Sequence, residues 1–148
     1  MLVKQIMTKT VITAKPDDRI KDIASLLYRR NLSGVPIIDD SNKVIGIVTE
    51  FDFINPDLEV HIPTYVDFLD SLEVDDTTNE MDEAVDRLKE ATIDQIMTRD
   101  VKTVLETTDV KEVVKMITTY RINPIPVVDN QNTLIGIVSR ADLIKILE

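Results

Sequence analysis

The chain has 148 residues, 43% of them hydrophobic, which is enough to bury a substantial core in one domain or in two small ones. Its formal net charge of −10 at pH 7 disfavours nonspecific binding to nucleic acid or to an anionic membrane, since both depend on Lys and Arg neutralising phosphates. Cysteine is absent, which excludes disulfides, thiolate nucleophiles and zinc–thiolate sites.

The apolar residues do not form a run near the length of a membrane span. The stretch "MLVKQIMTKTV" also lacks the long apolar region and the small-residue cleavage site of a secretory signal. We therefore expect a cytoplasmic protein whose partners include neither a membrane nor nucleic acid.

The negative charge is concentrated in one segment. Residues 57–94 hold 13 acidic and 2 basic side chains, a net charge of −11. The rest of the chain carries 14 acidic and 15 basic side chains, a net charge of +1. The remainder is therefore free to accept an anionic small ligand.

Residues 1–56 are predicted to form one β-α-β-β-α unit. The stretch "TVIT" (10–13) is typical of a short strand, and "PDD" (16–18) is predicted to open a helix. That helix has apolar residues at positions i, i+3, i+4 and i+7, which are Ile20, Ile23, Ala24 and Leu27.

Two further strands and a short helix complete this unit. "GVPIID" (34–39) and "KVIGIVT" (43–49) are rich in Val and Ile, and the polar turn "DSN" joins them. A helix is predicted to follow until Pro56 ends it.

The acidic segment 57–92 is predicted to be a helical insert. Two amphipathic stripes are indicated, one of them following a Thr77 to Glu80 capping box. The stripes consist of Tyr65, Phe68, Leu69 and Leu72, and of Met81, Ala84, Val85 and Leu88. The insert either packs on the core as a solvated element or offers a docking surface to a partner or a second copy.

Residues 93–148 repeat the first unit at an offset of 90 positions. "QIMT" at 5–8 returns at 95–98, and "GIVTEFD" at 46–52 returns as "GIVSRAD" at 136–142. The second unit has the same order of elements, with Val110, Val113, Val114 and Ile117 on its first helix and the strands "IPVVD" and "LIGIVS".

The strands of both units are nearly continuous in apolar residues, which indicates burial on both faces. One unit alone has too small a core to cover a second sheet face. We therefore predict an α+β fold in which the two units pack face to face with pseudo-twofold symmetry. Equivalent clefts are expected where strand ends and helix starts of the two units meet.

The repeated Gly-x-x-Thr/Ser-x-x-Asp pattern has two interpretations. Thr49 with Asp52, and Ser139 with Asp142, have the spacing of an N-cap and its third helical residue. A carboxylate can also accept two hydrogen bonds from a vicinal diol, and a helix N-terminus attracts a phosphate. Because the pattern recurs intact, we favour ligand binding over capping alone.

The order of these motifs resembles a tandem pair of CBS domains, the modules named after cystathionine β-synthase. The residues that carry the resemblance are "QIMT", "SGVPIID" with "NPIPVVD", and the two Gly-Ile-Val stretches. The resemblance implies that adenosine-containing ligands such as AMP, ADP, ATP or S-adenosylmethionine bind in clefts between the repeats and regulate a partner. It implies no required cofactor.

The resemblance also implies roles for particular residues. Asp52 and Asp142 would hold ribose hydroxyls, with Thr49 and Ser139 near the phosphate. The segments that line the base pocket contain Ser33, Gly34, Asn123 and Pro124, and the segments that lead into each repeat contain Lys4, Lys9 and Arg99. Which leading segment faces which Asp is left open.

The two units differ in ways that predict unequal ligand sites. Glu50 corresponds to Arg140, so a phosphate is expected to prefer the Arg140 side. Gly34 corresponds to Pro124, and Lys4 to an aspartate. Each of these charges is otherwise an ordinary solvated surface residue. Gly46 and Gly136 indicate either a bulge or the close approach of two backbones, or else a ligand contact.

An enzymatic function is disfavoured. The one histidine, His61, lies in the insert, and the three glycines form no phosphate-binding loop. Two hypotheses follow: a ligand sensor that assembles as a homodimer, or a constitutive scaffold with vestigial clefts whose acidic helices dock a basic partner. The retained pair of Asp residues favours the sensor, whereas Glu50 and Pro124 favour the scaffold.

Overall fold

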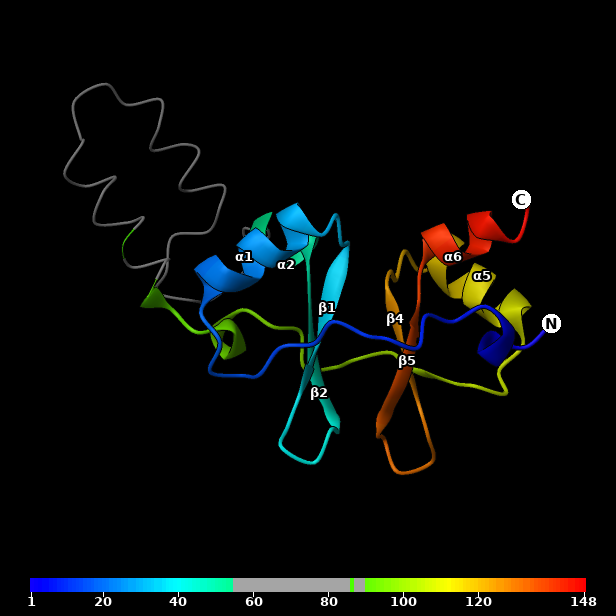
Figure 1. Ribbon diagram of the computed structural model, residues 1–148, viewed down its shortest axis with the longest axis horizontal. Coiled ribbons are helices and arrows are strands. Elements are labelled where there is room, and N and C mark those ends of the chain that lie inside the picture. Colours follow the sequence, from blue (N-terminus) through cyan, green and yellow to red (C-terminus); the bar gives the residue numbers. More distant parts are fainter. Residues whose placement is uncertain (55–85, 87–89) are drawn as a thin grey trace, which may run out of the picture.

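The structure is a computed structural model that describes residues 1–54, 86 and 90–148. Apart from Asp86, the residues predicted to form the two insert helices lie outside the described part, as does His61. The predicted α+β fold with two similar units is confirmed for the remainder, and Figure 1 shows the two units side by side.

The first repeat contains α1 (Ile20–Arg29), β1 (Gly34–Ile38), β2 (Val44–Thr49) and α2 (Glu50–Ile54). The strands β1 and β2 pair antiparallel in register from Gly34 opposite Thr49. Helix α1 begins at Ile20 and not at residues 16–18, which form a turn. The physical reason is that the Asp18 and Pro16 carbonyl groups accept hydrogen bonds from the backbone N–H groups of Ile93 and Asp94. These two residues belong to residues 90–99, called the second leading segment, and residues 1–9 are called the first leading segment.

The predicted strand at residues 10–13 is not formed. Instead the adjacent Ala14 makes a single parallel bridge to Ile37, in which the Ala14 N–H donates to the Pro36 carbonyl at 3.0 Å. The matching position of the second repeat extends into the two-residue strand β3 (Val104–Leu105). In each repeat, the segment before the first helix therefore pairs with one edge of the sheet over only one or two residues.

The second repeat continues with α5 (Val110–Thr118), β4 (Ile125–Val128), β5 (Leu134–Val138) and α6 (Arg140–Lys145). Its sheet has the order β3-β4-β5, with β3 parallel and β5 antiparallel to β4. Every residue of β1 and β4 is buried, which agrees with the continuous apolar pattern of these strands.

The first helix of each repeat buries a narrower face than its sequence predicts. Ile20, Ile23 and Leu27 of α1 are buried, but Ala24 is exposed. In α5 the matching Val114 is 40% exposed. The i+4 position lies off the side of the helix that contacts the small sheet, so the expectation for these two residues was wrong.

Each repeat is completed by the leading segment of the other repeat. The 3-10 helix η1 (Val3–Gln5) joins the second repeat, where the Val3 N–H donates to the Thr108 carbonyl at 2.9 Å. The 3-10 helix η2 (Ile93–Gln95) joins the first repeat. Figure 1 shows the two leading segments running in opposite directions between the repeats.

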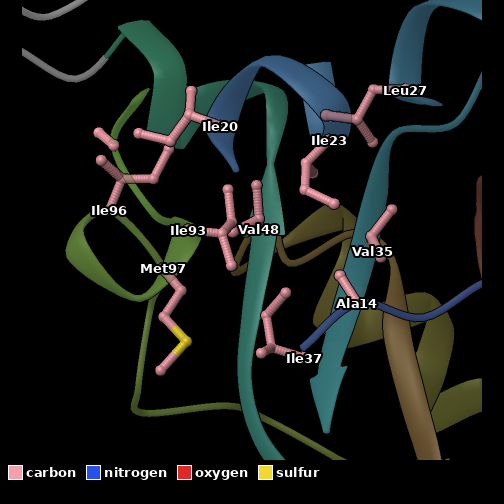
Figure 2. Close-up of a cluster of buried hydrophobic side chains, with 11 residues drawn as sticks. Ala14, Ile20, Ile23, Leu27, Val35, Ile37, Val48, Ile93, Ile96 and Met97 are labelled. Carbon is pink, nitrogen blue, oxygen red and sulfur yellow. The ribbon is translucent and has the colours of Figure 1, made fainter. Parts of the chain in front are cut away.

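The exchanged segments are part of the two hydrophobic cores. Ile93, Ile96 and Met97 pack with residues of α1, β1 and β2, as Figure 2 shows. In the second repeat the fully buried Val3 packs in the same way with Val113 and its neighbours. Neither repeat therefore has a complete core of its own.

Two glycines make room for this exchange. A Cβ atom on Gly46 would lie 2.5 Å from Sδ of Met97, and one on Gly136 would lie 2.6 Å from Sδ of Met7. Both methionines belong to the repeated "QIMT" stretches of the leading segments. Of the two interpretations of these glycines, the structure supports the close approach of two chain segments.

The hairpin turns join the two repeats at the end opposite the helices. The Asn42 side chain donates to the Leu134 carbonyl at 3.2 Å, and the Asn132 side chain donates to the Val44 carbonyl at 2.9 Å. Asn42 and Asn132 have positive φ values of 62° and 65°, which asparagine tolerates better than most residues. A shared apolar cluster of Ile38, Val44, Val128 and Leu134 lies beside them. These reciprocal contacts express the predicted pseudo-twofold symmetry.

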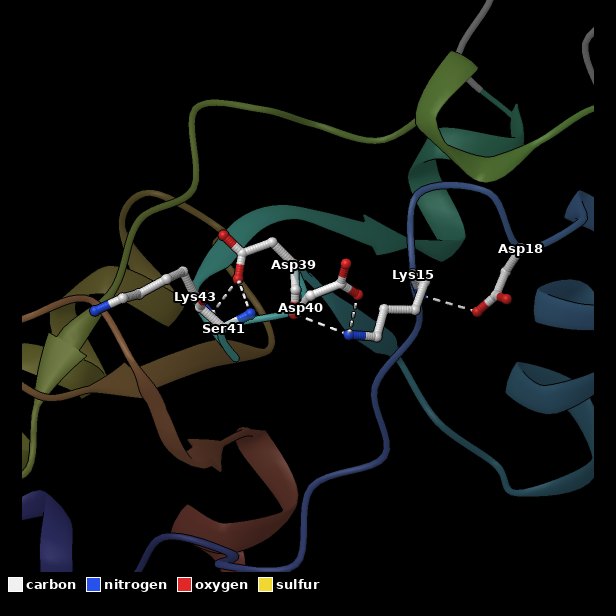
Figure 3. A network of polar contacts seen from close by, with 6 residues as sticks. All are labelled: Lys15, Asp18, Asp39, Asp40, Ser41 and Lys43. Carbon is white, nitrogen blue, oxygen red and sulfur yellow. Dashed lines mark hydrogen bonds and ion pairs between the residues drawn. The ribbon is translucent and has the colours of Figure 1, made fainter.

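A polar network fixes the first hairpin turn and is drawn in Figure 3. The Asp39 carboxylate accepts hydrogen bonds from the backbone N–H groups of Ser41 and Lys43, both at 2.9 Å. The Lys15 ammonium donates to the Asp39 carbonyl at 2.8 Å and lies 3.5 Å from the exposed Asp40 carboxylate. This network ties the segment before α1 to the turn.

The exchange of leading segments predicts where a core substitution acts. Ile93→Ala should lower the free energy of unfolding by about 2–5 kcal/mol, because it leaves a cavity at a fully buried position. Hydrogen exchange should show the loss of protection in α1 and β2, which belong to the other repeat. Loss of protection confined to α5 and β4 would contradict the exchanged arrangement.

Candidate functional site

A cleft beside Asp142 is formed by both repeats and is called the Asp142 cleft. Its volume is about 550 Å³, and its walls include Thr8, Ser33, Gly34 and Asn123. Asp142 follows the N-cap residue of α6, and the two residues between them begin the helix. One of its carboxylate oxygens accepts the Ser139 backbone N–H at 2.7 Å, and the other accepts the Thr8 hydroxyl at 3.1 Å.

The Asp52 cleft is the pseudo-symmetric counterpart on the other side. The Asp52 carboxylate accepts the Thr49 backbone N–H at 2.7 Å through one oxygen and the Thr98 hydroxyl at 2.9 Å through the other. Asn123 and Pro124 also line this cleft, whose volume is about 310 Å³. Each Asp therefore faces the leading segment that precedes the other repeat.

Thr8 and Thr98 were not singled out from the sequence. Their hydroxyls contact the two carboxylates across 134 and 46 positions of the chain, so no local spacing indicates the contact. The available signal was that "QIMT" ends on a hydroxyl residue in both copies. That repetition could have identified them.

The capping and ligand-binding interpretations of the repeated motif are compatible. Each Asp caps its helix start by accepting one backbone N–H. A carboxylate has about four lone-pair positions in all. The Thr49 and Ser139 hydroxyls also donate to Asp52 and Asp142, at 3.4 and 3.0 Å, so each Asp already accepts three hydrogen bonds. Since the serine and threonine hydroxyls can rotate to other partners, the carboxylate can accept a pair of vicinal hydroxyls while keeping its bond to the backbone N–H.

The two clefts differ in size and in the bulk of matching residues in their walls. Ala141 lines the Asp142 cleft, whereas the matching Phe51 lines the Asp52 cleft. Gly34 lines the Asp142 cleft alone, and its counterpart Pro124 lines both clefts. Gly34 has a packing role as well, because a Cβ atom on it would lie 2.7 Å from Cδ of Pro124.

Asn123 lies at the boundary of the two clefts and lines both of them. Its side-chain nitrogen donates to the Ser33 hydroxyl at 3.2 Å. Its side-chain oxygen accepts the Arg140 backbone N–H at 2.9 Å. Asn123 thus links the matching position of the first repeat, Ser33, to the helix start that carries Ser139 and Arg140.

Three of the sequence-predicted residues lie apart from this arrangement. Lys4, Lys9 and Arg99 are exposed on the leading segments and do not line either cleft. The Arg99 guanidinium donates to the Asp94 carbonyl at 3.2 Å. The remaining predicted residues, namely Ser33, Gly34, Thr49, Asp52, Asn123, Pro124, Ser139, Arg140 and Asp142, all line one or both clefts.

Asp52 is more enclosed than its counterpart. It is 9% exposed, whereas Asp142 is half-buried. Burial raises the pKa of the Asp52 carboxyl above its ordinary value, and the hydrogen bonds from Thr49 and Thr98 oppose this change without cancelling it. The two clefts therefore differ in electrostatics as well as in size.

Within the described part of the chain, no group of three His, Asp or Glu side chains could hold a metal ion. Nor does any helix among the described residues have the length and apolar character needed to cross a membrane. The arrangement is suited to hydrogen bonding of a hydroxylated, partly anionic small molecule.

Compared with known protein families, the chain matches the model for the CBS domain over residues 3–58 and 93–148. The chain belongs to the CBS-domain family. It is 31% identical over 156 residues to the uncharacterized protein MJ1426 of Methanocaldococcus jannaschii, and the match covers 99% of this chain and 91% of that relative.

A solved CBS domain pair, that of protein MJ0100, has the same fold with a TM-score of 0.69 and 28% identity. The match covers 99% of this chain and 95% of that one, which is in complex with 5′-methylthioadenosine and S-adenosyl-L-methionine. The chain is also 25% identical to inosine-5′-monophosphate dehydrogenase of M. jannaschii, but spans only 22% of that enzyme and 95% of its own length.

The raised pKa of Asp52 predicts a pH-dependent effect of Asp52→Asn. In the wild type the stabilising effect of protonation is complete below the ordinary value of 3.8 and is lost as the pH rises through the raised pKa. At neutral pH the Asn variant should therefore be at least as stable as the wild type, because Asn keeps an acceptor for Thr49 without a buried charge.

Urea unfolding of the two proteins from about pH 4 to about pH 7 measures this effect. The wild type should gain stability relative to Asp52→Asn as the pH falls through the raised pKa, and groups common to both proteins cancel in the difference. A variant that is less stable at pH 7 by an amount independent of pH would show that burial does not control this carboxyl.

Proposed function

We propose that this CBS pair is a regulatory module that senses adenosine-containing ligands, namely AMP, ADP, ATP or S-adenosylmethionine, in its two clefts. The observation that carries the proposal is the paired arrangement of carboxylate, threonine hydroxyl and helix start at each cleft. The complex of the related MJ0100 pair with two adenosine compounds supports it.

The proposed roles follow from the contacts. Asp52 and Asp142 would accept hydrogen bonds from the ribose hydroxyls, because the Ser and Thr hydroxyls that donate to each carboxylate can rotate away and leave acceptor positions free. Ser33, Gly34, Asn123 and Pro124 would enclose the base, since they line the clefts that contain these carboxylates. Thr49, Ser139 and Arg140 would lie beside a phosphate at the helix starts.

The clefts also bear on the alternative of a constitutive scaffold. Vestigial clefts would be expected to be filled by side chains, whereas volumes of about 550 and 310 Å³ are open between the repeats. We therefore favour the sensor, acting without catalysis and without a required cofactor. The regulated protein partner, the part played by the acidic insert and the cytoplasmic location remain predictions.

Substitution of the Asp142 carboxylate tests the proposal. Asp142→Asn keeps an acceptor for the Ser139 N–H but removes the charge, so the melting temperature should change little. A lost charge-assisted contact of about 1.5–3 kcal/mol should weaken adenosine or AMP roughly 10- to 150-fold at about 1.4 kcal/mol per tenfold. Titration calorimetry and ligand-induced thermal shift measure the two effects.

Asp109→Asn is the matched control for this experiment. Asp109 also caps a helix, accepting the Lys111 backbone N–H at 2.8 Å, but it lines neither cleft. The Asp109→Asn variant should bind the ligand as tightly as the wild type does. Equal affinities of wild type and Asp142→Asn would reduce the motif to helix capping, and no thermal shift with any adenosine compound would overturn the proposed function.

We further propose that the protein forms a homodimer. Large apolar side chains on three helices remain exposed in the single chain, with Tyr28, Phe51 and Ile144 exposed by 89%, 73% and 66%. A second copy would remove this surface from water. Light scattering at micromolar concentration should give twice the mass of the 16.8 kDa chain, and a monomer mass would refute the assembly.

A further inference from the structure

The Asp52 cleft has two distinct ends. One end adjoins a third cavity of about 310 Å³, and the residues that line both spaces are Thr49, Phe51, Arg121 and Asn123. Thr49, the proposed neighbour of a phosphate, marks this inner end. The residues that line the cleft alone include four apolar ones, which are Ile47, Val101, Ile122 and Pro124. A nucleoside whose ribose lies at Asp52 therefore places its base at this outer, apolar end.

The outer end of the Asp142 cleft is built from matching positions. The counterparts of the four apolar residues at the offset of 90 also line that cleft, and they are Ile137, Val11, Leu32 and Gly34. Two positions beside Val101 and Val11 break the match. Asp100 and Lys102 line the Asp52 cleft, whereas Thr10 and Ile12 line the Asp142 cleft. The outer ends of the clefts therefore differ in charge at these two positions.

Asp100 and Lys102 present an acceptor and a donor side by side. The Lys102 ammonium lies 3.1 Å from the Asp100 carboxylate, and the two side chains are 55% and 85% exposed. An ion pair as exposed as this one adds little to stability. The carboxylate keeps further acceptor positions and the ammonium keeps further donors. Both groups can therefore form hydrogen bonds with a base in the cleft.

The edge of guanine complements this pair of groups. Guanine carries N–H donors at N1 and N2 and, next to them, the acceptor O6. A carboxylate accepts from both N–H groups and a lysine donates to O6, so that all of these hydrogen bonds are charge-assisted. Adenine places an acceptor, N1, beside its amino group, and an acceptor does not bond to a carboxylate. The pair Asp100 and Lys102 therefore favours guanine over adenine.

The corresponding residues of the Asp142 cleft do not make this distinction. Ile12 has no polar group in its side chain. The Thr10 hydroxyl can donate or accept, so it can bond to either purine. The side chains at the outer end of the Asp142 cleft are thus compatible with adenine.

We propose that the Asp52 cleft is a guanosine site in which Asp100 and Lys102 recognise the base, while the Asp142 cleft binds adenosine. The inference rests on the proposed role of Asp52 as the acceptor for ribose, and it extends the ligands of the protein from one purine to two. A protein with one site for each purine responds to the balance between them.

Exchange of the two residues for their counterparts tests the proposal. Asp100→Thr combined with Lys102→Ile should weaken guanosine binding at least about tenfold, because charge-assisted hydrogen bonds are lost. Titration calorimetry measures this affinity. The melting temperature should hardly change, since both side chains are exposed. The reverse exchange, Thr10→Asp combined with Ile12→Lys, should create a second guanosine site.

Inosine identifies the contact that Asp100 makes. Inosine keeps O6 and the N1–H group of guanosine but lacks the amino group at N2. The wild type should therefore bind inosine more weakly than guanosine, and the exchange at positions 100 and 102 should reduce the difference. Equal affinities of the wild type for inosine and guanosine would overturn recognition of the guanine edge.

Arg19→Ala combined with Glu90→Ala is the matched control. This variant removes an exposed pair of opposite charges, 3.5 Å apart, that lines none of the three cavities. It should bind guanosine as tightly as the wild type does. Equal weakening by the two double variants would reveal a general effect of charge removal and overturn the guanosine site. Absence of guanosine binding to the wild type would overturn it as well.

The two nucleosides separate this inference from the proposed function. If guanosine binds through Asp100 and Lys102 but no adenosine compound binds, the proposed function fails and the guanosine site stands. If adenosine binds in both clefts and guanosine binds in neither, the guanosine site fails and the proposed function stands.

Discussion

The close packing of each repeat against the leading segment of the other is the contact on which the rest of the structure depends. Sδ of Met97 lies 2.5 Å from the point that a Cβ atom on Gly46 would occupy, and Sδ of Met7 lies 2.6 Å from the same point on Gly136. Because these methionines and their neighbours fill the two cores, neither core is complete until both repeats have formed. The same exchange carries Thr8 to Asp142 and Thr98 to Asp52. The segments that complete the two cores therefore also set the geometry of the two clefts.

The repeated motif shows how one carboxylate can serve stability and recognition together. One oxygen of each Asp accepts both the backbone N–H and the hydroxyl of the N-cap residue, Thr49 or Ser139. The opposite oxygen faces the leading segment and the cleft. A residue fixed by its own helix start is held in position before any ligand arrives, which reduces the entropy lost on binding. Capping thus holds the carboxylate in a fixed position at its cleft.

Pseudo-twofold symmetry sets the positions of the clefts, and the differences between the repeats give each cleft its character. Ala141 lines the Asp142 cleft where the matching Phe51 lines the Asp52 cleft, and the Asp52 carboxylate is more enclosed than that of Asp142. Burial raises the pKa of the Asp52 carboxyl above its ordinary value. Asn123, which has hydrogen bonds to Ser33 and to the Arg140 N–H, is the wall that the clefts share. The two clefts therefore differ in size and in electrostatics.

The sequence by itself determined the architecture and the residue types of the site. The offset of 90 positions, the continuous apolar strands and the repeated Gly-x-x-Thr/Ser-x-x-Asp pattern are local signals, and periodicity together with capping spacing suffices to interpret them. They led to two similar α+β units, to the family and to nine residues that line the clefts. Interpretation was less accurate for Ala24, Val114 and residues 10–13, where contact with a very small sheet overrides local pattern.

Only the tertiary structure decided which segments meet. The pairing of Thr8 with Asp142 and of Thr98 with Asp52 spans 134 and 46 positions, and both the exchanged and the unexchanged arrangement have the same local sequence. The choice depends on which core the leading segments complete, and that is a property of packing over the whole chain. The cavity that Arg121 lines together with Ser33 and Thr49 likewise exists only because residues of both repeats meet there.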